Sequence, residues 1–347
     1  MSFDLDAITR DNVKGLSPYS SARDEYVSDG SKMVFLDANE NPYDNGVNRY
    51  PDPKQRNLKG LLAQRKGITE ANLLLGNGSD EVLDLLFRAF CEPGMDNIIT
   101  LPPTYGMYKV LSGINGVENR EVLLDADFQP KLSEILATAD GHSKMLFLCS
   151  PNNPTGNTIS AQGIAHLLEH FKGLVVMDEA YIDFSSQASW VGQWSQYPNL
   201  VVTQTLSKAY GMAGIRLGIC MASVAIISVL NKIKPPYNVN ELTQQRALER
   251  VLDQQAVQRE ITAILAERQR LYNVLQEVPF VSKVHPTEAN FILAQVDNAT
   301  LRYDQLLKKG IVVRNRTAQP LCHNTLRFTV GTPEENQTLI AALNQLS

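Results

Sequence analysis

The strongest constraint on the fold of this sequence is a series of short, continuous apolar segments that each end at a polar, glycine or proline turn. They occupy residues 72–76, 98–101, 145–149, 173–177, 200–203 and 216–221, and helical periodicity follows several of them. Unbroken apolar runs are typical of strands covered by helices on both faces. We therefore predict an α/β fold with a mainly parallel, doubly wound sheet.

The pattern changes near residue 240 and suggests a second, smaller domain. A long, charged helical stretch is followed by the strand-like pieces NFILAQV, IVVRN and LRFTV. The length of 347 residues suits about two domains. We predict an N-terminal segment, 1–45, that packs on the small domain or on a partner chain, a large ligand-binding domain, 46–245, and a small C-terminal α+β domain, 246–347.

Composition excludes several classes of protein. The formal net charge of -5 argues against a nucleic-acid partner, and the sequence has no apolar run long enough to span a membrane. The polar N-terminus predicts a cytoplasmic protein rather than a secreted one. The 4 cysteines form no CxxC pair, and the 5 histidines lack ligand spacing, so we expect no metal site. Cys149 and Cys220 lie in apolar runs, where they read as small buried hydrophobes.

Ligands of open α/β sheets bind beyond the carboxyl ends of the strands, where the unusual polar residues of this sequence gather. The segment TLSKAYGMAGIR places Lys208 just after an apolar run. Lysine amines form Schiff bases with carbonyl compounds. Thr205 and Ser207 offer hydroxyls, and Arg216 offers a forked cation, all suited to a phosphate. The alternative for Lys208 is an ordinary lysine in a glycine-rich turn.

Asp178 ends another apolar run, in the motif DEAY. A carboxylate at the end of a parallel strand can pair with a pyridinium nitrogen, which keeps a pyridine ring protonated and electron-withdrawing. Tyr181, three residues later, could donate a hydrogen bond to a phenolate oxygen. Alone, Asp178 would more often be a helix N-cap. Together with Lys208 it favours a pyridine-containing carbonyl cofactor.

Three further turns add polar groups with the same chemistry. Asn153, in SPNNPTG, could bind a phenolate oxygen, although in isolation a plain turn is the favoured explanation of the motif. Ser79 and Asp80, in GNGSDE, open a predicted helix whose N-terminus suits a phosphate; Ser79 or Asp80 could be a plain N-cap, and the two roles can coexist. Tyr105, in PPTYG, could stack on a ring or lie in the core.

Taken together, the motifs NGSDE, PPTYG, SPNNPTG, DEAY and TLSKAYGMAGIRLG resemble those of the class II pyridoxal phosphate-dependent aminotransferases of fold type I. The likeness extends from about Tyr19 to Gly331. It implies that Lys208 forms the Schiff base with pyridoxal phosphate and moves the proton, and that Asp178 binds the ring nitrogen. The remaining cofactor contacts that it implies are Asn153 and Tyr181 on the phenolate oxygen, Tyr105 on the ring, and Ser79, Asp80, Thr205, Ser207 and Arg216 around the phosphate.

Weaker signals within the same resemblance concern the substrate. These signals are an early PY and the motifs ANENPY, NRYPDP and VVRN…LRFTVGT. They favour a ping-pong exchange in which histidinol phosphate and 2-oxoglutarate give imidazole-acetol phosphate and glutamate, a reaction of histidine biosynthesis. The resemblance implies a homodimer in which Tyr50 reaches the cofactor phosphate of the partner subunit. The substrate contacts that it implies are Tyr19, Asn290, Arg314 and Arg327. Arg23 could approach the substrate phosphate, although a surface salt bridge is the favoured reading.

Several alternatives remain open. A threonine-phosphate decarboxylase or an aromatic amino-acid aminotransferase would keep the same cofactor residues. A nicotinamide-dependent dehydrogenase would share the sheet, but no GxGxxG follows the first strand. A non-catalytic protein on the same scaffold would not need Lys208, Asp178 and Arg216 together.

Overall fold

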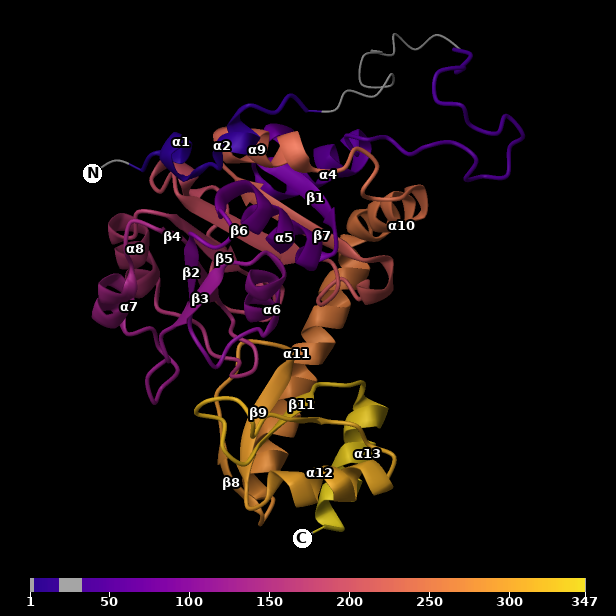
Figure 1. Ribbon diagram of the computed structural model, residues 1–347. Coiled ribbons are helices and arrows are strands. Elements are labelled where there is room, and N and C mark those ends of the chain that lie inside the picture. The colour runs from indigo at the N-terminus through magenta and orange to yellow at the C-terminus, as the bar shows by residue number, and fades with distance from the viewer. Residues whose placement is uncertain (1–2, 19–32, 347) are drawn as a thin grey trace.

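The computed structural model describes residues 3–18 and 33–346. Figure 1 shows a large lobe and a small lobe joined by one long helix, α11. The helices are α1 (Leu5–Ile8), α2 (Asp11–Lys14), α4 (Arg56–Lys66), α5 (Ser79–Phe90), α6 (Met107–Ile114), α7 (Leu132–Thr138), α8 (Ala161–His170), α9 (Val224–Ile233), α10 (Glu241–Leu252), α11 (Gln254–Glu277), α12 (Ala299–Lys308) and α13 (Pro333–Asn344). Short 3-10 helices are η1 (Glu70–Asn72), η2 (Ile182–Phe184), η3 (Gln193–Ser195) and η4 (Ala213–Ile215).

The large domain is built on a mixed sheet with the strand order β1-β7-β6-β5-β4-β2-β3. Its strands are β1 (Leu73–Asn77), β2 (Asn97–Thr100), β3 (Glu118–Glu121), β4 (Ser143–Cys149), β5 (Leu174–Asp178), β6 (Leu200–Thr205) and β7 (Leu217–Ala222). Neighbours from β6 to β3 pair in parallel, whereas β7 runs antiparallel to both β1 and β6. The predicted α/β class with a mainly parallel sheet is confirmed.

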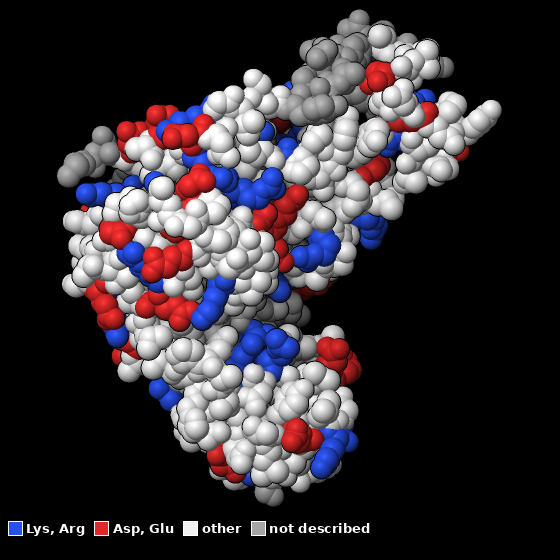
Figure 2. All heavy atoms as spheres, viewed as in Figure 1, with Lys and Arg blue, Asp and Glu red and all other residues white. Residues whose placement is uncertain are grey.

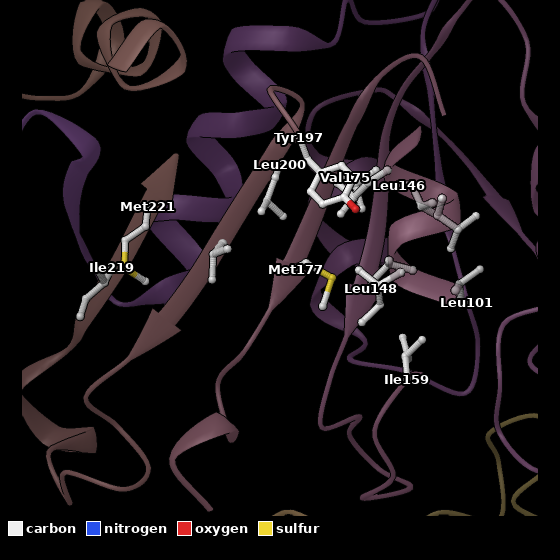
Figure 3. Packing of buried hydrophobic residues seen from close by; sticks show 14 of the residues in the cluster. Leu101, Leu146, Leu148, Ile159, Val175, Met177, Tyr197, Leu200, Ile219 and Met221 are labelled. Atoms are coloured by element: carbon white, nitrogen blue, oxygen red, sulfur yellow. The ribbon is translucent and has the colours of Figure 1, made fainter. Parts of the chain in front are cut away.

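Successive residues of the central strands enter two separate cores, one on each face of the sheet. On β5, Val175 and Met177 face the core formed with α4, α7, α8 and α10. Leu174 and Val176 face the core formed with α5, α6 and α9. Figure 3 shows part of the first core, with labelled side chains of β4, β5, β6 and β7 packed on one face of the sheet. Burial on both faces explains why the strands read as continuous apolar runs.

The small domain contains a second sheet with the order β10-β11-β9-β8 and antiparallel pairing throughout. Its strands are β8 (Val281–Val284), β9 (Phe291–Val296), β10 (Arg314–Asn315) and β11 (Thr325–Thr329). One face packs on α11, α12 and α13. The joint with the large domain is a small apolar cluster that contains Tyr181, Ala209, Ile261 and Phe291.

The structure differs from the prediction at the boundary between the two domains and in the long helical stretch that follows residue 240. The predicted boundary after residue 245 falls inside α10, which packs on α4 and η4 of the large domain. The predicted long helix is broken at Asp253, whose carboxylate caps the first turn of α11 by accepting from Ala256 N. The large domain therefore continues to the end of α10, because Ala247 and Val251 complete its core.

The prediction that the N-terminal segment packs on the small domain is wrong for residues 3–16. Residues 3–16 contact the large domain, not the small one: Ile8 is buried in the core beneath α5 and α9, and Arg10 forms an ion pair with Glu92 at 2.9 Å. Lys232 of α9 donates to Lys14 O at 2.8 Å. The apolar anchor Ile8 and these polar contacts fix the segment to the large domain.

Two further features follow from the described residues. No helix among them is long and apolar enough to cross a membrane. Cys91, Cys149, Cys220 and Cys322 are all buried and unpaired, which confirms the reading of Cys149 and Cys220 as buried hydrophobes.

Candidate active site

The candidate site lies at one edge of the large sheet, where the parallel strands end. Lys208 follows β6, Asp178 ends β5, and Asn153 follows β4. Ser79 follows β1, and Arg216 comes just before the reversed strand β7, so its side chain starts from the same edge. A single sheet edge thus brings together groups that are up to 137 positions apart, as the ligand rule for open α/β sheets predicts.

Lys208 lies in the joint between the two domains. It is partly buried, and its Nζ lies 5.7 Å from the centre of the Tyr181 ring. Burial, followed by repulsion from Arg327, lowers the pKa of Lys208, while the nearby carboxylate of Asp178 acts in the opposite direction. A lowered pKa keeps more of the amine neutral, which is the form that attacks a carbonyl carbon.

Asp178 is almost completely buried, with 4% of its surface exposed. Its Oδ2 accepts a hydrogen bond of 2.6 Å from the hydroxyl of Tyr108, and its Oδ1 accepts one of 3.1 Å from Ala180 N. Burial raises the pKa of Asp178, and these hydrogen bonds and Lys208 oppose that rise. A buried carboxylate of this kind gains most from a cationic partner, such as a protonated ring nitrogen.

A cradle for a phosphate lies at the start of α5. The N-cap residue is Gly78, so no side-chain cap occupies the first backbone N–H groups of this helix. Gly78 has φ +83°, and a Cβ there would lie 2.5 Å from a guanidinium nitrogen of Arg216. Only glycine permits this close approach, which brings the Arg216 cation to the positive end of the helix.

The side chains of this cradle have different roles. Asp80 accepts from the Tyr105 hydroxyl at 3.1 Å and lies 3.6 Å from Arg216, so its carboxylate orients these two groups. The hydroxyl of Thr205 donates a hydrogen bond to Leu217 O and accepts one from Ser207 N. Thr205 therefore stabilises the turn that follows β6. The anion-binding groups left over are Arg216, the Ser207 hydroxyl and the N–H groups of α5.

On the opposite side of Lys208, a polar group forms between the domains. Asn153 Nδ2 donates to the Tyr181 hydroxyl at 3.5 Å, and Arg327 donates to Asn153 Oδ1. The preceding residue, Asn152, stabilises the loop after β4: its Nδ2 donates hydrogen bonds to Pro103 O and Thr155 Oγ1. The structure thus brings Asn153 and Tyr181 together near Lys208, as predicted for a pair that shares one oxygen ligand.

Three arginines occupy one face of the small sheet. Arg314 pairs directly with Arg327 across β10 and β11, and Arg316 N continues this ladder by donating to Thr325 O. Since side chains alternate along a strand, all three belong to the face opposite the small-domain core. None forms an ion pair with an acidic side chain among the described residues. Figure 2 shows basic atoms gathered where the small lobe faces the large one.

Burial and the charges of Arg327 and Arg314 lower the pKa of Arg316 to about 10. The Nε atoms of Arg316 and Arg327 are buried without a hydrogen-bond partner. Three cations this close need an anion to offset their repulsion. The arrangement is suited to binding carboxylates or phosphates of a substrate, through planar guanidinium groups.

The other predicted residues lie in different places. Tyr50 is about half exposed and stacks on Tyr237, with ring centres 4.5 Å apart; it lies on the segment 33–50 that extends away from the large lobe in Figure 1. Asn290 directly precedes β9, and its carbonyl accepts from Val330 N at the joint. Tyr19 and Arg23 fall outside the described residues.

Sequence reasoning missed two members of the site. Tyr108 lies three residues after Tyr105, so both can project from one side of the start of α6. Arg316 lies two residues after Arg314, the spacing that places both on one face of a strand. Both signals are weak, because the spacing alone does not show which face meets the ligand.

Comparison with known proteins agrees with this geometry. The family model for aminotransferase class I and II matches residues 27–343. A histidinol-phosphate aminotransferase of Flavobacterium johnsoniae is 65% identical, over 100% of this chain and 99% of that protein. The crystal structure of the histidinol-phosphate aminotransferase from Clostridium acetobutylicum matches with a TM-score of 0.80 and 25% identity, covering 86% of this chain and 91% of the other. A Sinorhizobium meliloti histidinol-phosphate aminotransferase in complex with pyridoxal-5'-phosphate has the same fold, with a TM-score of 0.78, 24% identity, and coverage of 86% and 84%.

The chain therefore belongs to the class I and II aminotransferases and is an enzyme whose cofactor is pyridoxal phosphate. The residues present fit this cofactor. The uncapped start of α5 with Arg216 suits its phosphate, and Asp178 suits its ring nitrogen. Lys208, which is partly buried and has a lowered pKa, suits its aldehyde.

Proposed function

We propose that this enzyme exchanges amino groups between histidinol phosphate and 2-oxoglutarate, in the biosynthesis of histidine. The observation that carries the proposal is the pairing of the Lys208 and Asp178 site with three arginines, Arg314, Arg316 and Arg327, that form no ion pair with an acidic side chain in the described ranges 3–18 and 33–346. Histidinol phosphate carries a phosphate, and glutamate carries two carboxylates, so both substrates require forked cations. The name shared by relatives over their full length supports the same substrate.

Each residue has a distinct role in this proposal. Bound pyridoxal phosphate supplies an aldehyde and an electron-withdrawing ring. Lys208 would bond to the aldehyde carbon through its amine, with loss of water, and as a free amine it would hold and move the proton taken from the substrate carbon. Asp178 would hold the proton on the ring nitrogen, and Asn153 with Tyr181 would fix the phenolate oxygen. The substrates alternate in one site, so a ping-pong cycle follows.

A substrate panel tests the proposal. We expect the purified enzyme to transfer the amino group of glutamate to imidazole-acetol phosphate, with much lower rates for aromatic 2-oxo acids that lack a phosphate. The measurement is steady-state formation of 2-oxoglutarate, with double-reciprocal plots that give parallel lines. Release of CO2 from threonine phosphate without amino transfer would overturn the proposal, as would a preference for aromatic amino acids.

Arg327 is expected to bind the anionic end of both substrates. Replacing it in the Arg327→Gln variant should raise KM for glutamate and for histidinol phosphate by about tenfold to a hundredfold, because a charge-assisted hydrogen bond is lost. Initial-rate kinetics with both substrates measure this change. The control is Arg259→Gln, which removes an exposed arginine of α11. Unchanged KM values in Arg327→Gln would remove this residue from substrate binding.

The homodimer belongs to the same proposal. The segment 33–50 carries exposed apolar side chains, among them Val34, Leu36 and Val47, which a second copy of the chain would cover. Tyr50 on this segment would then donate its hydroxyl to the cofactor phosphate of the partner subunit.

The Tyr50→Phe variant is expected to bind pyridoxal phosphate about tenfold more weakly while remaining a dimer, because one hydrogen bond to a charged group is lost. Cofactor titration and analytical ultracentrifugation measure the two properties. Tyr43→Phe, on the same segment and 81% exposed, is the matched control. A monomeric wild-type enzyme with full activity would contradict the role of Tyr50.

We also infer a reducing, cytoplasmic location, because the four cysteines are buried thiols that form no disulfide.

A further inference from the structure

Tyr108 is a buried tyrosine whose hydroxyl points at the carboxylate of Asp178. The residue belongs to α6 and is fully buried. Its ring stacks on Phe147, with centres 4.7 Å apart and planes 20° apart, and meets the edge of Tyr105 at 5.6 Å. Packing on two sides fixes the direction of the hydroxyl, which donates to Asp178 Oδ2 at 2.6 Å.

This contact completes the support of the Asp178 carboxylate. One oxygen accepts from Ala180 N, and the other accepts from Tyr108, so the group is held from two directions and cannot rotate freely. Nothing in the local sequence requires this contact, since the two residues are 70 positions apart and come from different elements.

The contact also bears on the charge of Asp178. Burial is the largest influence and disfavours the ionised carboxylate, and the charge of Asp80 acts in the same direction. The Tyr108 hydroxyl is the first of the groups that oppose burial, ahead of Ala180 N and the more distant Lys208. The thiol of Cys149 also faces this pair, and burial raises its pKa, so it stays neutral. The hydroxyl pKa of Tyr108 is raised by burial and by Asp178, which keeps it a donor.

We propose that Tyr108 is a positioning residue that keeps the Asp178 carboxylate ionised and oriented toward the pyridine nitrogen of the cofactor. This inference rests on the proposed function, because it assumes that Asp178 pairs with that nitrogen. The step that Tyr108 supports is retention of a proton: the ionised carboxylate holds the proton on the ring nitrogen while Lys208 moves the substrate proton.

The Tyr108→Phe variant tests the proposal, because it removes one oxygen and keeps the ring that stacks on Phe147. In the cofactor-free protein, we expect the pKa of Asp178 to rise by about one pH unit or more, the size of a hydrogen bond to a charged group. Carbon-13 NMR of protein labelled at its aspartate carboxyl groups measures this pKa. The Asp178 signal is identified by its absence from the spectrum of the Asp178→Asn variant. In the loaded enzyme, we expect pyridoxal phosphate to bind about tenfold more weakly, and nitrogen-15 NMR of the labelled cofactor to show a less protonated ring nitrogen.

Two further variants separate a positioning role from a structural one. Tyr197→Phe removes the hydroxyl of another buried tyrosine, which contacts Gln196 at 3.0 Å, and should change none of these readings. Phe147→Leu loosens the stacking but leaves the hydroxyl, so it should lower Tm while moving the Asp178 pKa less than Tyr108→Phe does.

An Asp178 pKa in Tyr108→Phe within 0.3 units of wild type, or an unchanged ring-nitrogen signal, would overturn the proposal. Failure of the wild-type enzyme to bind pyridoxal phosphate would instead overturn the proposed function, and the cofactor-free pKa measurement would still report on the contact between Tyr108 and Asp178.

Discussion

The Lys208→Ala variant is expected to lose at least about a thousandfold in kcat and to retain its fold. The Lys208 amine lies 5.7 Å from the centre of the Tyr181 ring and is influenced by the charges of Asp178 and Asp80. Without it, neither covalent capture of the aldehyde nor transfer of the substrate proton has a group to perform it. Single-turnover absorbance changes with glutamate measure the loss.

Chemical trapping makes this expectation more specific. Borohydride reduction of the wild-type enzyme should fix pyridoxyl mass on the peptide that contains Lys208, and Lys208→Ala should carry none. Lys283→Ala, which removes an exposed lysine of β8, is the control and should label as wild type. Labelling at a different lysine would remove Lys208 from its role.

The Asp178→Ala variant is expected to fold and to lose about a hundredfold to a thousandfold in kcat, with smaller changes in KM. The reason is electrostatic: without a carboxylate at this position, the buried site does not keep the ring nitrogen protonated, and the substrate carbanion loses its electron sink. Steady-state kinetics on both half-reactions measure the change.

Matched substitutions distinguish charge from volume at this position. Asp178→Asn keeps the size and removes the charge, so its loss should approach that of Asp178→Ala. Asp178→Glu keeps the charge and should retain more activity than either. Near-normal turnover in Asp178→Ala would contradict the assignment.

Much of the site could be predicted because it depends on local patterns. Apolar runs at 145–149, 173–177 and 200–203 became the parallel strands β4, β5 and β6, and their ends became one sheet edge. Since parallel strands bring their carboxyl ends to the same edge of the sheet, the sequence alone predicts that Lys208 and Asp178 lie close together. The cofactor prediction followed from their chemistry.

The domain limits were less predictable. The stretch from Glu241 to Glu277 has one helical period, yet it forms two helices that serve different domains. The break at Asp253 depends on local capping of α11. By contrast, α10 belongs to the large domain because it packs against α4. Periodicity shows that a helix has an apolar face, and it does not show which partner covers that face.

The sequence by itself determined the class of fold, the cofactor chemistry and the side chains that follow the strands, because these depend on hydrophobic periodicity and on residue type. Only the tertiary structure decided that Tyr108 supports Asp178, that Arg316 joins Arg314 and Arg327, and that residues 3–16 cover the large domain. Each of these is a contact between segments far apart in the chain. Such contacts are set by how whole elements pack, and no local pattern of residues encodes them.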